Sequence, residues 1–388
     1  MRIMHISRAA ETLRWFLIPA MTVQKKLGHY VCICTSDIPD ACITEGETRD
    51  TVHLRNAGFD VFPNSLKRSL NPLSIIKAIL LVRQILTEHR IEVIICHNPL
   101  GAFVGRIAAW LAKTPRIVYF AHGLPCAPAQ GVVSWRLRFW AEKLLGRVTD
   151  AILVMNSYDE KLCKTRRVIK NIDNVFRIPG MGVDLTRYGL DDTEKVKREV
   201  AKELVIPEHQ KIVLFVGRLV PEKGVFVLTE AAEKICARRK DICFLVAGGG
   251  PSMDKLKNVV RANHLEDNFR FLGWRDDIPR LCKSADIFTL PTYYNEGLPV
   301  SILEAMACGK PVVATLHRGC EDAVVDGQTG FLVPVKQVSP LADKITLLLA
   351  NEHLRKEMGQ AGRQRVEQYF ELGYCTEKIV EALEKAIH

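Results

Sequence analysis

Short, nearly continuous apolar runs alternate along the chain with longer segments in which apolar residues recur every three or four positions. Buried parallel strands read as continuous apolar runs, and helices that cover a sheet show the 3.6-residue period. The alternation therefore predicts an α/β fold with parallel sheets and helices on both faces. We expect strands near residues 1–7, 29–35, 59–62, 91–96, 116–120, 150–155 and 174–178, and then near 211–217, 242–247, 268–272, 286–290, 311–315 and 330–333.

The chain has the length and the turn pattern of two domains. Its 388 residues exceed one ordinary hydrophobic core, because single cores stop growing at roughly 250–300 residues. Turn-forming residues cluster at 179–184, which reads Pro-Gly-Met-Gly-Val-Asp, and we interpret this segment as a hinge. We expect a Rossmann-like, doubly wound domain over residues 1–183 and a second one over 184–373. In the second domain, helices are expected over 222–238, 251–263 and 298–308.

Charge divides at nearly the same place. Residues 1–188 carry 26 Lys and Arg against 15 Asp and Glu, a net charge of +11, whereas the rest of the chain carries 28 against 29. A basic domain can meet nucleic acid, an anionic membrane or an acidic substrate. Nucleic acid is not an expected partner, because the sequence has no helix-turn-helix, zinc-finger or RNA-binding signature.

One segment, residues 295–311, combines two carboxylates with a short helix. Pro299 suits a first helical position and Gly309 supplies a stop, so Glu296 lies in the preceding loop and Glu304 inside the helix. The two carboxylates then reach two ends of a ligand about 10 Å long. Free backbone N–H groups at the start of the helix, from Gly297 and Leu298, favour a diphosphate there.

Two further segments complete a family pattern. Residues 215–224 read Phe-Val-Gly-Arg-Leu-Val-Pro-Glu-Lys-Gly, and residues 244–251 read Phe-Leu-Val-Ala-Gly-Gly-Gly-Pro. Together with Glu296 and Glu304, seven residues apart, they resemble glycosyltransferase family 4. The resemblance spans nearly the whole chain and implies the GT-B fold, in which two Rossmann-like domains face a central cleft. It also implies that the last helix, about 374–388, packs back on the first domain.

The same resemblance implies roles in the second domain. Arg218 and Lys223 would neutralise the charge that grows on the departing nucleotide diphosphate, and both count with Glu296, which faces the donor sugar, as catalytic candidates. Glu304 would hold the ribose hydroxyls. The other expected donor-binding positions are Gly217, Gly248, Gly249, Gly250, Gly297, Leu298, Pro299 and, through backbone contacts to the nucleobase, Trp274 and Arg275.

In the first domain the resemblance rests on His97-Asn98-Pro99, on 105–109 and on Tyr119-Phe120-Ala121-His122-Gly123. These segments are most similar to bacterial enzymes that add N-acetylhexosamines to lipid-diphosphate-linked glycans, so this domain would bind the acceptor. His122, at a strand end, is the fourth catalytic candidate, because the matching family histidine contacts the donor sugar near the reacting carbon. His97 is an acceptor-side candidate.

The sequence departs from the family after the first strand. Many members carry a Gly-Gly pair there, which cradles the donor phosphate, whereas this chain reads Ser-Arg-Ala-Ala at 7–10. Close approach of the backbone to a phosphate is therefore less expected at this point. Arg8 or Arg14 could instead meet an acceptor diphosphate.

No metal and no cofactor are expected. The sequence contains no Asp-x-Asp triplet to hold a metal on a nucleotide diphosphate, so Arg218, Lys223 and the helix near residue 298 would replace it. The 12 cysteines include no C-x2-C pair. Cys32, Cys34, Cys96 and Cys243 fall in apolar runs and are expected to be buried thiols of a reducing compartment, not zinc ligands.

The expected location is cytoplasmic and peripheral on the inner face of the cell membrane. No run of about 18 uncharged apolar residues occurs, and residues 1–6 read as a strand rather than a signal peptide. Within 132–147, Trp135, Phe139 and Leu145 share much of one helix side, with four cations against one acid. Such a helix suits an anionic membrane interface. It equally suits packing on the sheet, and the sequence leaves both open.

The resemblance thus implies a retaining glycosyltransferase that moves a sugar, an N-acetylhexosamine, from a UDP-sugar donor to a polyprenyl-diphosphate-linked or other glycan acceptor in surface polysaccharide or glycan biosynthesis. Alternatives of similar architecture are a sugar phosphorylase, a sugar-nucleotide epimerase and a non-catalytic membrane-associated subunit of a glycan assembly complex. A dinucleotide oxidoreductase is disfavoured, because Gly248 and Gly250 do not continue into G-x-G-x-x-G.

Overall fold

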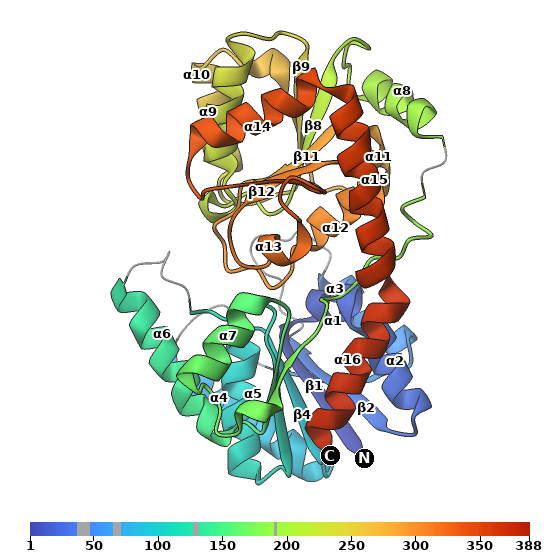
Figure 1. The fold of residues 1–388 in the computed structure, drawn as a ribbon. Coiled ribbons are helices and arrows are strands. Elements are labelled where there is room, and N and C mark those ends of the chain that lie inside the picture. The colour runs from blue at the N-terminus through green and yellow to red at the C-terminus, as the bar shows by residue number, and fades with distance from the viewer. Residues whose placement is uncertain (37–46, 65–70, 127–131, 190–191) are drawn as a thin grey trace. The chain divides into compact units, whose positions relative to one another are not determined.

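The computed structural model describes residues 1–36, 47–64, 71–126, 132–189 and 192–388. It consists of two compact units (Figure 1). The first comprises Met1–Met181 with Cys375–His388, and the second comprises Gly182–Tyr374. The boundary therefore falls inside the turn-rich segment 179–184.

The first unit is built on one parallel sheet of seven strands in the order β3-β2-β1-β4-β5-β6-β7. Chain order reverses between β1 and β4, the switch point of a doubly wound sheet. Its strands are β1 (Arg2–Ala9), β2 (Tyr30–Ser36), β3 (Asp60–Pro63), β4 (Val93–His97), β5 (Arg116–Phe120), β6 (Ala151–Val154) and β7 (Val175–Arg177). Its helices are α1 (Ala10–Phe16), α2 (Ile18–Lys26), α3 (Glu47–Asn56), α4 (Pro72–Glu88), α5 (Pro99–Ala112), α6 (Val132–Leu145), α7 (Ser157–Arg166) and the end of α16 (Leu372–Ile387).

Local sequence explains how β4 passes into α5. All five residues of β4, Val-Ile-Ile-Cys-His, are buried, as in a strand covered on both faces. Asn98 then caps α5 by accepting a hydrogen bond from the backbone N–H of Gly101, and Pro99 occupies the first turn. The strand therefore ends where the cap begins, and this places His97 at the carboxyl edge of the sheet.

The second unit repeats the scheme with six parallel strands in the order β10-β9-β8-β11-β12-β13, and the switch point lies between β8 and β11. Its strands are β8 (Lys211–Val216), β9 (Ile242–Ala247), β10 (Phe269–Gly273), β11 (Ile287–Leu290), β12 (Val312–Thr315) and β13 (Gly330–Val333). Its helices are α8 (Thr193–Glu203), α9 (Val225–Cys236), α10 (Met253–Ala262), α11 (Ile278–Ser284), α12 (Val300–Ala307), α13 (Cys320–Ala323), α14 (Val338–Ala350) and α15 (Glu352–Tyr369).

The predicted fold class is confirmed, and every expected strand is present within two or three residues of its predicted bounds. Helix starts differ more. The helix expected from residue 222 begins at Val225, because Pro221–Lys223 forms a 3-10 turn that ends at Gly224 with φ of 78°. Pro299 is the N-cap of α12 rather than its first helical residue. Gly309 follows that helix with φ of 66°, a left-handed stop.

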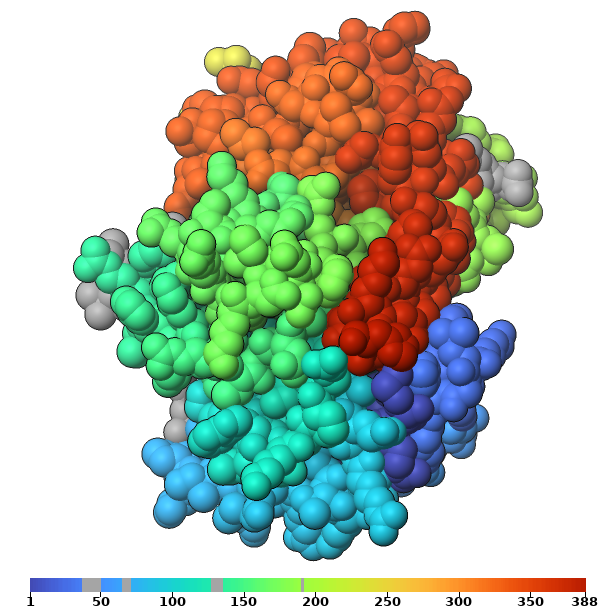
Figure 2. Space-filling view, turned by 60° about the horizontal axis from the view of Figure 1, so that its bottom comes forward, coloured from blue at the N-terminus to red at the C-terminus, as the bar shows by residue number. Residues whose placement is uncertain are grey.

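The C-terminal helix α16 joins the first unit from Cys375 onward (Figure 2). Cys375, Ile379 and Leu383 are buried along one side of it. At its end, the backbone carbonyl of Ile387 accepts a hydrogen bond from the side chain of Arg116 at 3.4 Å. The helix thus completes one face of the first sheet with residues from the far end of the sequence.

Candidate active site

The candidate residues of the second unit lie on loops at the carboxyl edge of its sheet. Arg218 and Lys223 follow β8, and Glu296 follows the neighbouring strand β11. These two strands flank the point at which strand order reverses, where doubly wound sheets bind ligands. The fold therefore brings together residues that lie more than 70 positions apart in the sequence.

Lys223 and Glu296 form an ion pair. The Lys223 ammonium lies 2.6 Å from Oε1 of Glu296, which also accepts a hydrogen bond from the Thr292 hydroxyl at 3.0 Å. Gly224 fixes the turn before α9, because a Cβ at this position would lie 1.9 Å from the backbone carbonyl oxygen of Pro291. The loops after β8 and β11 thus hold each other, and the lysine is held with them.

Arg218 approaches the same place from the surface. Its guanidinium lies 5.6 Å from the centroid of the Tyr294 ring, and the Lys223 ammonium lies 5.5 Å from that centroid. Tyr294 therefore gathers two cations by cation–π attraction. The sequence motifs did not point to Tyr294 or Thr292, although both lie within four residues of Glu296.

The glycine run after β9 is explained in part by packing within the unit. A Cβ on Gly248 would lie 2.0 Å from the carbonyl oxygen of Gly217, and one on Gly250 would lie 2.4 Å from that of Leu219. Gly249 faces open space, so it leaves room for a ligand. Gly217, in contrast, has space for a Cβ at ordinary contact distance, so nothing in the unit itself requires glycine there.

Helix α12 offers donors at its start and a carboxylate in its interior. The N–H groups of Leu298, Val300 and Ser301 have no acceptor in the part of the chain that the structure describes, and Pro299 gives no side-chain cap. Glu304 accepts a hydrogen bond from the Tyr188 hydroxyl. Burial raises the pKa of Glu304, while this hydrogen bond lowers it. Tyr188 was not foreseen from the sequence, since it lies 116 positions away.

Trp274 and Arg275 follow β10, at the same edge. The guanidinium of Arg275 pairs with Asp277 at 2.7 Å and with Glu203 at 2.9 Å, so it is occupied by two carboxylates. The indole of Trp274 is 62% exposed and donates to Asp276 at 3.2 Å. The Arg275 side chain is thus committed within the unit, which leaves the backbone and the indole as the groups open to a base.

In the first unit, three histidines and one glutamine form a hydrogen-bonded row that we call the histidine chain: Gln24, His5, His97 and His122. Oε1 of Gln24 lies 2.9 Å from Nε2 of His5. Nδ1 of His5 lies 3.0 Å from Nε2 of His97, and Nδ1 of His97 lies 3.0 Å from Nε2 of His122. His97 and His122 were predicted from the sequence motifs, whereas no motif marks Gln24 or His5.

Burial keeps these imidazoles neutral. It lowers the pKa of His5 and that of His122 to about 4, and it lowers the pKa of His97 well below its ordinary value. The neighbouring rings add to the effect on His97, because a second positive charge beside it is unfavourable. At neutral pH each ring therefore has one N–H donor and one acceptor nitrogen.

The segment that replaces the family's Gly-Gly pair is tied to the start of α5. Asn98 donates to the Ser7 hydroxyl at 2.7 Å, and a Cβ on Gly101 would lie 3.0 Å from the backbone nitrogen of Arg8. Arg14 forms an ion pair with Asp50 and stacks on Trp15. Of the two arginines expected on the acceptor side, Arg14 is thus already paired with a carboxylate.

Helix α6 packs against the core of the first unit through the side that carries Phe139 and Leu145. Leu145 is buried, and Phe139 packs against the core of the first unit. Behind them, the buried Arg106 of α5 donates to Glu142 at 2.8 Å. Of the two alternatives that the sequence left open for this side of the helix, the structure shows packing on the core at Phe139 and Leu145.

A different face of α6 is exposed. Leu137, Trp140 and Leu144 are 73%, 64% and 62% accessible, and their spacing of three and four positions places them on one side of the helix. Figure 2 shows this helix, in blue-green, at the surface of the first unit. We call these three residues the α6 apolar stripe. Within the described residues, no helix has the length and apolar character needed to cross a bilayer.

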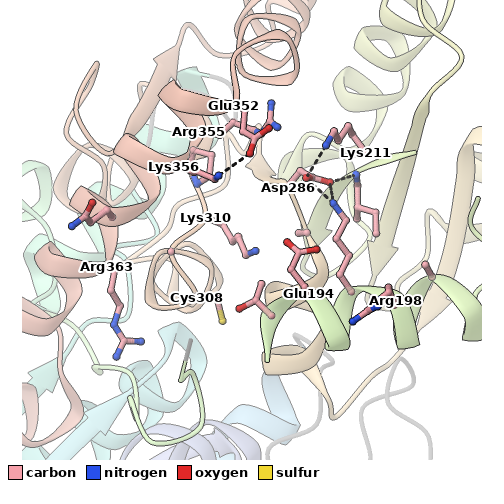
Figure 3. A pocket seen from close by; sticks show the side chains of 18 of the residues that line it. Glu194, Arg198, Lys211, Asp286, Cys308, Lys310, Glu352, Arg355, Lys356 and Arg363 are labelled. Carbon is pink, nitrogen blue, oxygen red and sulfur yellow. Dashed lines mark hydrogen bonds and ion pairs between the residues drawn. The ribbon is translucent and has the colours of Figure 1, made fainter. Parts of the chain in front are cut away.

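The second unit also contains a cavity of about 830 Å³ on the opposite edge of its sheet, at the amino ends of β8, β11 and β12 (Figure 3). Lys197 in its wall contacts both oxygens of Asp286, at 2.7 and 2.8 Å, and Lys356 pairs with Glu352 at 2.8 Å. None of the candidate residues lines it. The candidate residues thus lie at the other edge of this sheet, away from the cavity.

Thiols and metal ligands give no further site within the described residues. The 11 cysteines described there, including Cys32, Cys34, Cys96 and Cys243, are buried and form no disulfide. In the same part of the chain, no group of three or more His, Cys, Asp or Glu is placed to hold a metal ion.

Two units of this topology, with ligand loops at the carboxyl edges of their sheets, define the GT-B class. Solved structures show the same fold. The crystal structure of Anabaena Alr3699/HepE in complex with UDP and glucose matches with a TM-score of 0.82 and 19% identity, over 99% of this chain and 100% of that one. The crystal structure of WaaG, a glycosyltransferase involved in lipopolysaccharide biosynthesis, matches with a TM-score of 0.74 and 18% identity, over 98% and 99%.

The chain belongs to the group 1 glycosyltransferase family. The model described as glycosyl transferases group 1 matches residues 196–365, and that of the glycosyl transferase 4-like domain matches residues 22–172. A phosphatidyl-myo-inositol mannosyltransferase of Mycobacterium leprae is 30% identical over 74% of this chain and 72% of its own. The predicted resemblance to glycosyltransferase family 4 is confirmed, and the protein is an enzyme of this class.

Two bacterial relatives match nearly end to end. The N,N'-diacetylbacillosaminyl-diphospho-undecaprenol alpha-1,3-N-acetylgalactosaminyltransferase of Campylobacter jejuni is 28% identical over 96% of this chain and 95% of its own. The UDP-Gal:alpha-D-GlcNAc-diphosphoundecaprenol alpha-1,3-galactosyltransferase of Escherichia coli is 25% identical over 88% and 87%.

Proposed function

We propose that this glycosyltransferase moves an N-acetylhexosamine, with retention of the anomeric configuration, from a UDP-sugar to a polyprenyl-diphosphate-linked glycan. The observation that carries the proposal is the convergence of Arg218 and Lys223 on Tyr294, beside Glu296 at the carboxyl edge of the second sheet. Two fixed cations suit a diphosphate leaving group, whose charge grows as the sugar departs.

The donor is assigned to the second unit. The open space at Gly249 and the N–H groups at the start of α12 support a bound diphosphate, and we assign the ribose hydroxyls to Glu304 in the same helix. The named activity of the Campylobacter relative and the UDP complexes of the Anabaena protein support an N-acetylhexosamine on UDP.

The donor assignment is tested by calorimetric titration of UDP, GDP and ADP into the full chain, followed by assays with UDP-N-acetylhexosamines. We expect UDP to bind at least tenfold more tightly than the other two. A preference for GDP or ADP would overturn the assignment. Formation of a sugar phosphate from inorganic phosphate, or isomerisation of the donor without an acceptor, would instead indicate a phosphorylase or an epimerase.

The chemical step assigns one task to each charged group. As the bond between the anomeric carbon and the β-phosphate oxygen breaks, the acceptor hydroxyl oxygen bonds to that carbon from the same face, and its proton passes to a phosphate oxygen. Arg218 and Lys223 stabilise the charge on the departing diphosphate. Glu296 is engaged by Lys223 and Thr292 and so positions the sugar rather than attacking it. The two cations do the work of a metal, and we expect activity to persist in a chelator. NMR of the product's anomeric proton tests retention.

The acceptor is assigned to the first unit. Its net charge of +11 over residues 1–188 suits a lipid diphosphate, and both near-full-length relatives are named for diphospho-undecaprenol substrates. Arg8 is the remaining candidate on this side, since Arg14 already pairs with Asp50. His97 is fully buried and both of its ring nitrogens are bonded to other histidines, so it does not contact the acceptor directly. Comparison of rates on a lipid-diphosphate sugar and on the same sugar without lipid tests the assignment, and equal rates would contradict it.

The α6 apolar stripe is proposed to rest on the cytoplasmic face of an anionic membrane. Leu137, Trp140 and Leu144 are flanked by the exposed Arg136, Arg138 and Arg147, and each cation near an anionic surface adds roughly 1 kcal/mol before screening. Co-sedimentation tests this with two kinds of vesicle: one of phosphatidylcholine alone, and one in which about one lipid in three is phosphatidylglycerol. Equal binding to both at low salt would overturn the proposal.

A further inference from the structure

We infer that Gln24 sets the direction of every hydrogen bond in the histidine chain and thereby fixes the tautomer of His122. The inference rests on the proposed function only where it places His122 beside the substrate. Gln24, His5 and His97 are positioning residues in this scheme, because they act on the substrate through His122.

The direction follows from the chemistry of the first link. Oε1 of the Gln24 amide can only accept, so the proton shared with His5 belongs to Nε2 of that ring. A neutral imidazole has a single N–H, so Nδ1 of His5 must accept, and it accepts from Nε2–H of His97. By the same rule, Nδ1 of His97 accepts from Nε2–H of His122. All three rings therefore carry their proton on Nε2.

Burial keeps the histidine chain neutral, with one proton on each ring. Gln24, His5 and His97 have no solvent-accessible surface. Within the described residues, no Asp, Glu, Lys or Arg hydrogen-bonds to any of the three rings, and the Phe120 ring packs against His97 and His122 at 5.2 and 4.9 Å. Adding a proton would place an unpaired charge in this apolar setting, and an unpaired buried donor or acceptor also costs stability.

The consequence for a ligand is specific. Nδ1 of His122 has no hydrogen-bond partner among the described residues. Because the proton of this ring is on Nε2, Nδ1 has a free lone pair. It can accept a hydrogen bond from a hydroxyl or an amide N–H, but it has no proton to donate to a phosphate or carboxylate oxygen. The histidine chain thus selects the hydroxyl and amide groups of a sugar and leaves anion binding to the cations of the second unit.

Turning the Gln24 amide by 180° is the opposing arrangement. Nε2 of Gln24, which has no partner in the part of the chain described, would then donate to His5. Every proton of the chain would move to Nδ1, and His122 would become a donor. The two arrangements predict opposite tautomers for all three rings, so one spectrum separates them.

The experiment is a long-range ¹H–¹⁵N NMR spectrum of the full chain labelled at histidine, recorded without substrate at neutral pH. We expect three rings that do not titrate near their ordinary pKa, each with the proton on Nε2. Protons on Nδ1 in the wild-type chain would overturn the inference. This measurement requires no variant and no donor, so it stands even if the proposed function fails.

A variant tests the control by Gln24. Gln24→Leu removes the acceptor, and we expect His122, two links away, to shift toward a mixture of tautomers, with kcat about tenfold lower and UDP affinity unchanged. Gln24→Glu, which can only accept when ionised, should keep the proton on Nε2 of His5. Met21→Leu, a buried change on the same helix, should leave all three rings as they were. An unchanged His122 spectrum in folded Gln24→Leu would overturn the role of Gln24.

Discussion

Each unit has a buried ion pair, and the two pairs differ in accessibility. Arg106 and Glu142 join helices α5 and α6 of the first unit at 2.8 Å, with side chains 1% and 7% exposed. Lys223 and Glu296 join two loops of the second unit at 2.6 Å, with side chains 16% and 10% exposed. The first pair lies between two helices that cover the sheet, and the second lies at the edge of its sheet where doubly wound folds generally bind ligands.

This difference separates structure from function. Arg106 also donates to the carbonyl of Ala102 and stacks on Tyr119 at 4.3 Å, and its side chain is only 1% exposed, so it is enclosed within the unit. Among the described residues, Lys223 hydrogen-bonds only to Glu296, and its side chain remains 16% exposed. A ligand anion can therefore compete for Lys223 but not for Arg106. The two pairs should respond to substitution in opposite ways.

The largest effect is expected from Arg106→Met. It leaves Glu142 buried without its partner, which costs about 3–5 kcal/mol of stability. Urea unfolding followed by tryptophan fluorescence checks it, because Trp110, Trp135 and Trp140 lie on α5 and α6.

The double variant Arg106→Met/Glu142→Leu is the matched control. With both charges replaced by apolar groups, most of the lost stability should return. A loss below about 1 kcal/mol in the single variant would mean that Glu142 finds another partner or water, and the contrast between the two pairs would disappear.

Lys223→Ala should act on turnover instead. We expect kcat to fall by a factor on the order of 10² or more, because the charge on the leaving diphosphate loses a fixed cation. Steady-state rates at saturating donor measure it. Lys234→Ala, at an exposed lysine of α9 that bonds to Ser339, is the control and should leave kcat unchanged. A wild-type rate for Lys223→Ala would remove this lysine from the site.

A smaller effect is expected when the α6 apolar stripe is made polar. The stripe lies on the exposed side of α6, away from the buried Arg106–Glu142 pair. Leu137→Ser/Trp140→Ser should lower binding to phosphatidylglycerol vesicles about tenfold or more, since each large apolar side chain contributes roughly 1.5–3 kcal/mol when fully buried. Val205→Ser, an equally exposed position of the second unit, should not change binding. Unaltered binding by the double variant would show that α6 does not face the lipid.

The sheets could be predicted because their signal is local. Runs such as Ile-Cys-Phe-Leu-Val-Ala in β9 are buried throughout and carry their own evidence of being strands. Helix α6 shows the limit of such reasoning. Its apolar residues occupy two faces, and only the packing of Phe139 on the core and the pairing of Glu142 with Arg106 decide which face is buried.

The candidate site was predicted where residues are close in sequence and was incomplete where contacts are distant. Glu296 and Lys223 followed from family motifs, but the partnership of Glu304 with Tyr188 joins positions 116 apart. Gln24 and His5 lie in ordinary helix and strand patterns, and nothing local marks them as neighbours of His97. Such side-chain pairings depend on the strand order β1-β4-β5, which the hydrophobic pattern alone does not specify.

The smallest effect is expected from substitution of Glu304 in the second unit. Glu304 is hydrogen-bonded to Tyr188, whereas Glu296 is paired with a lysine. Burial raises the pKa of Glu304 above the ordinary 4.5. A raised pKa means that folding favours the protonated form, so the stabilisation is present below pH 4.5 and is lost as pH rises through the folded-state pKa.

Glu304→Gln stays neutral and can still accept from Tyr188. We therefore expect this variant to melt at a higher temperature than wild type at pH 7, with a difference in melting temperature that shrinks towards pH 4. UDP should bind to it about tenfold more weakly, because a neutral amide is a poorer acceptor for ribose hydroxyls. Tyr188→Phe, which removes the donor, should lower the melting temperature at pH 7. Equal melting of wild type and Glu304→Gln at both pH values, with unchanged UDP affinity, would mean that this carboxylate is solvated and takes no part in binding.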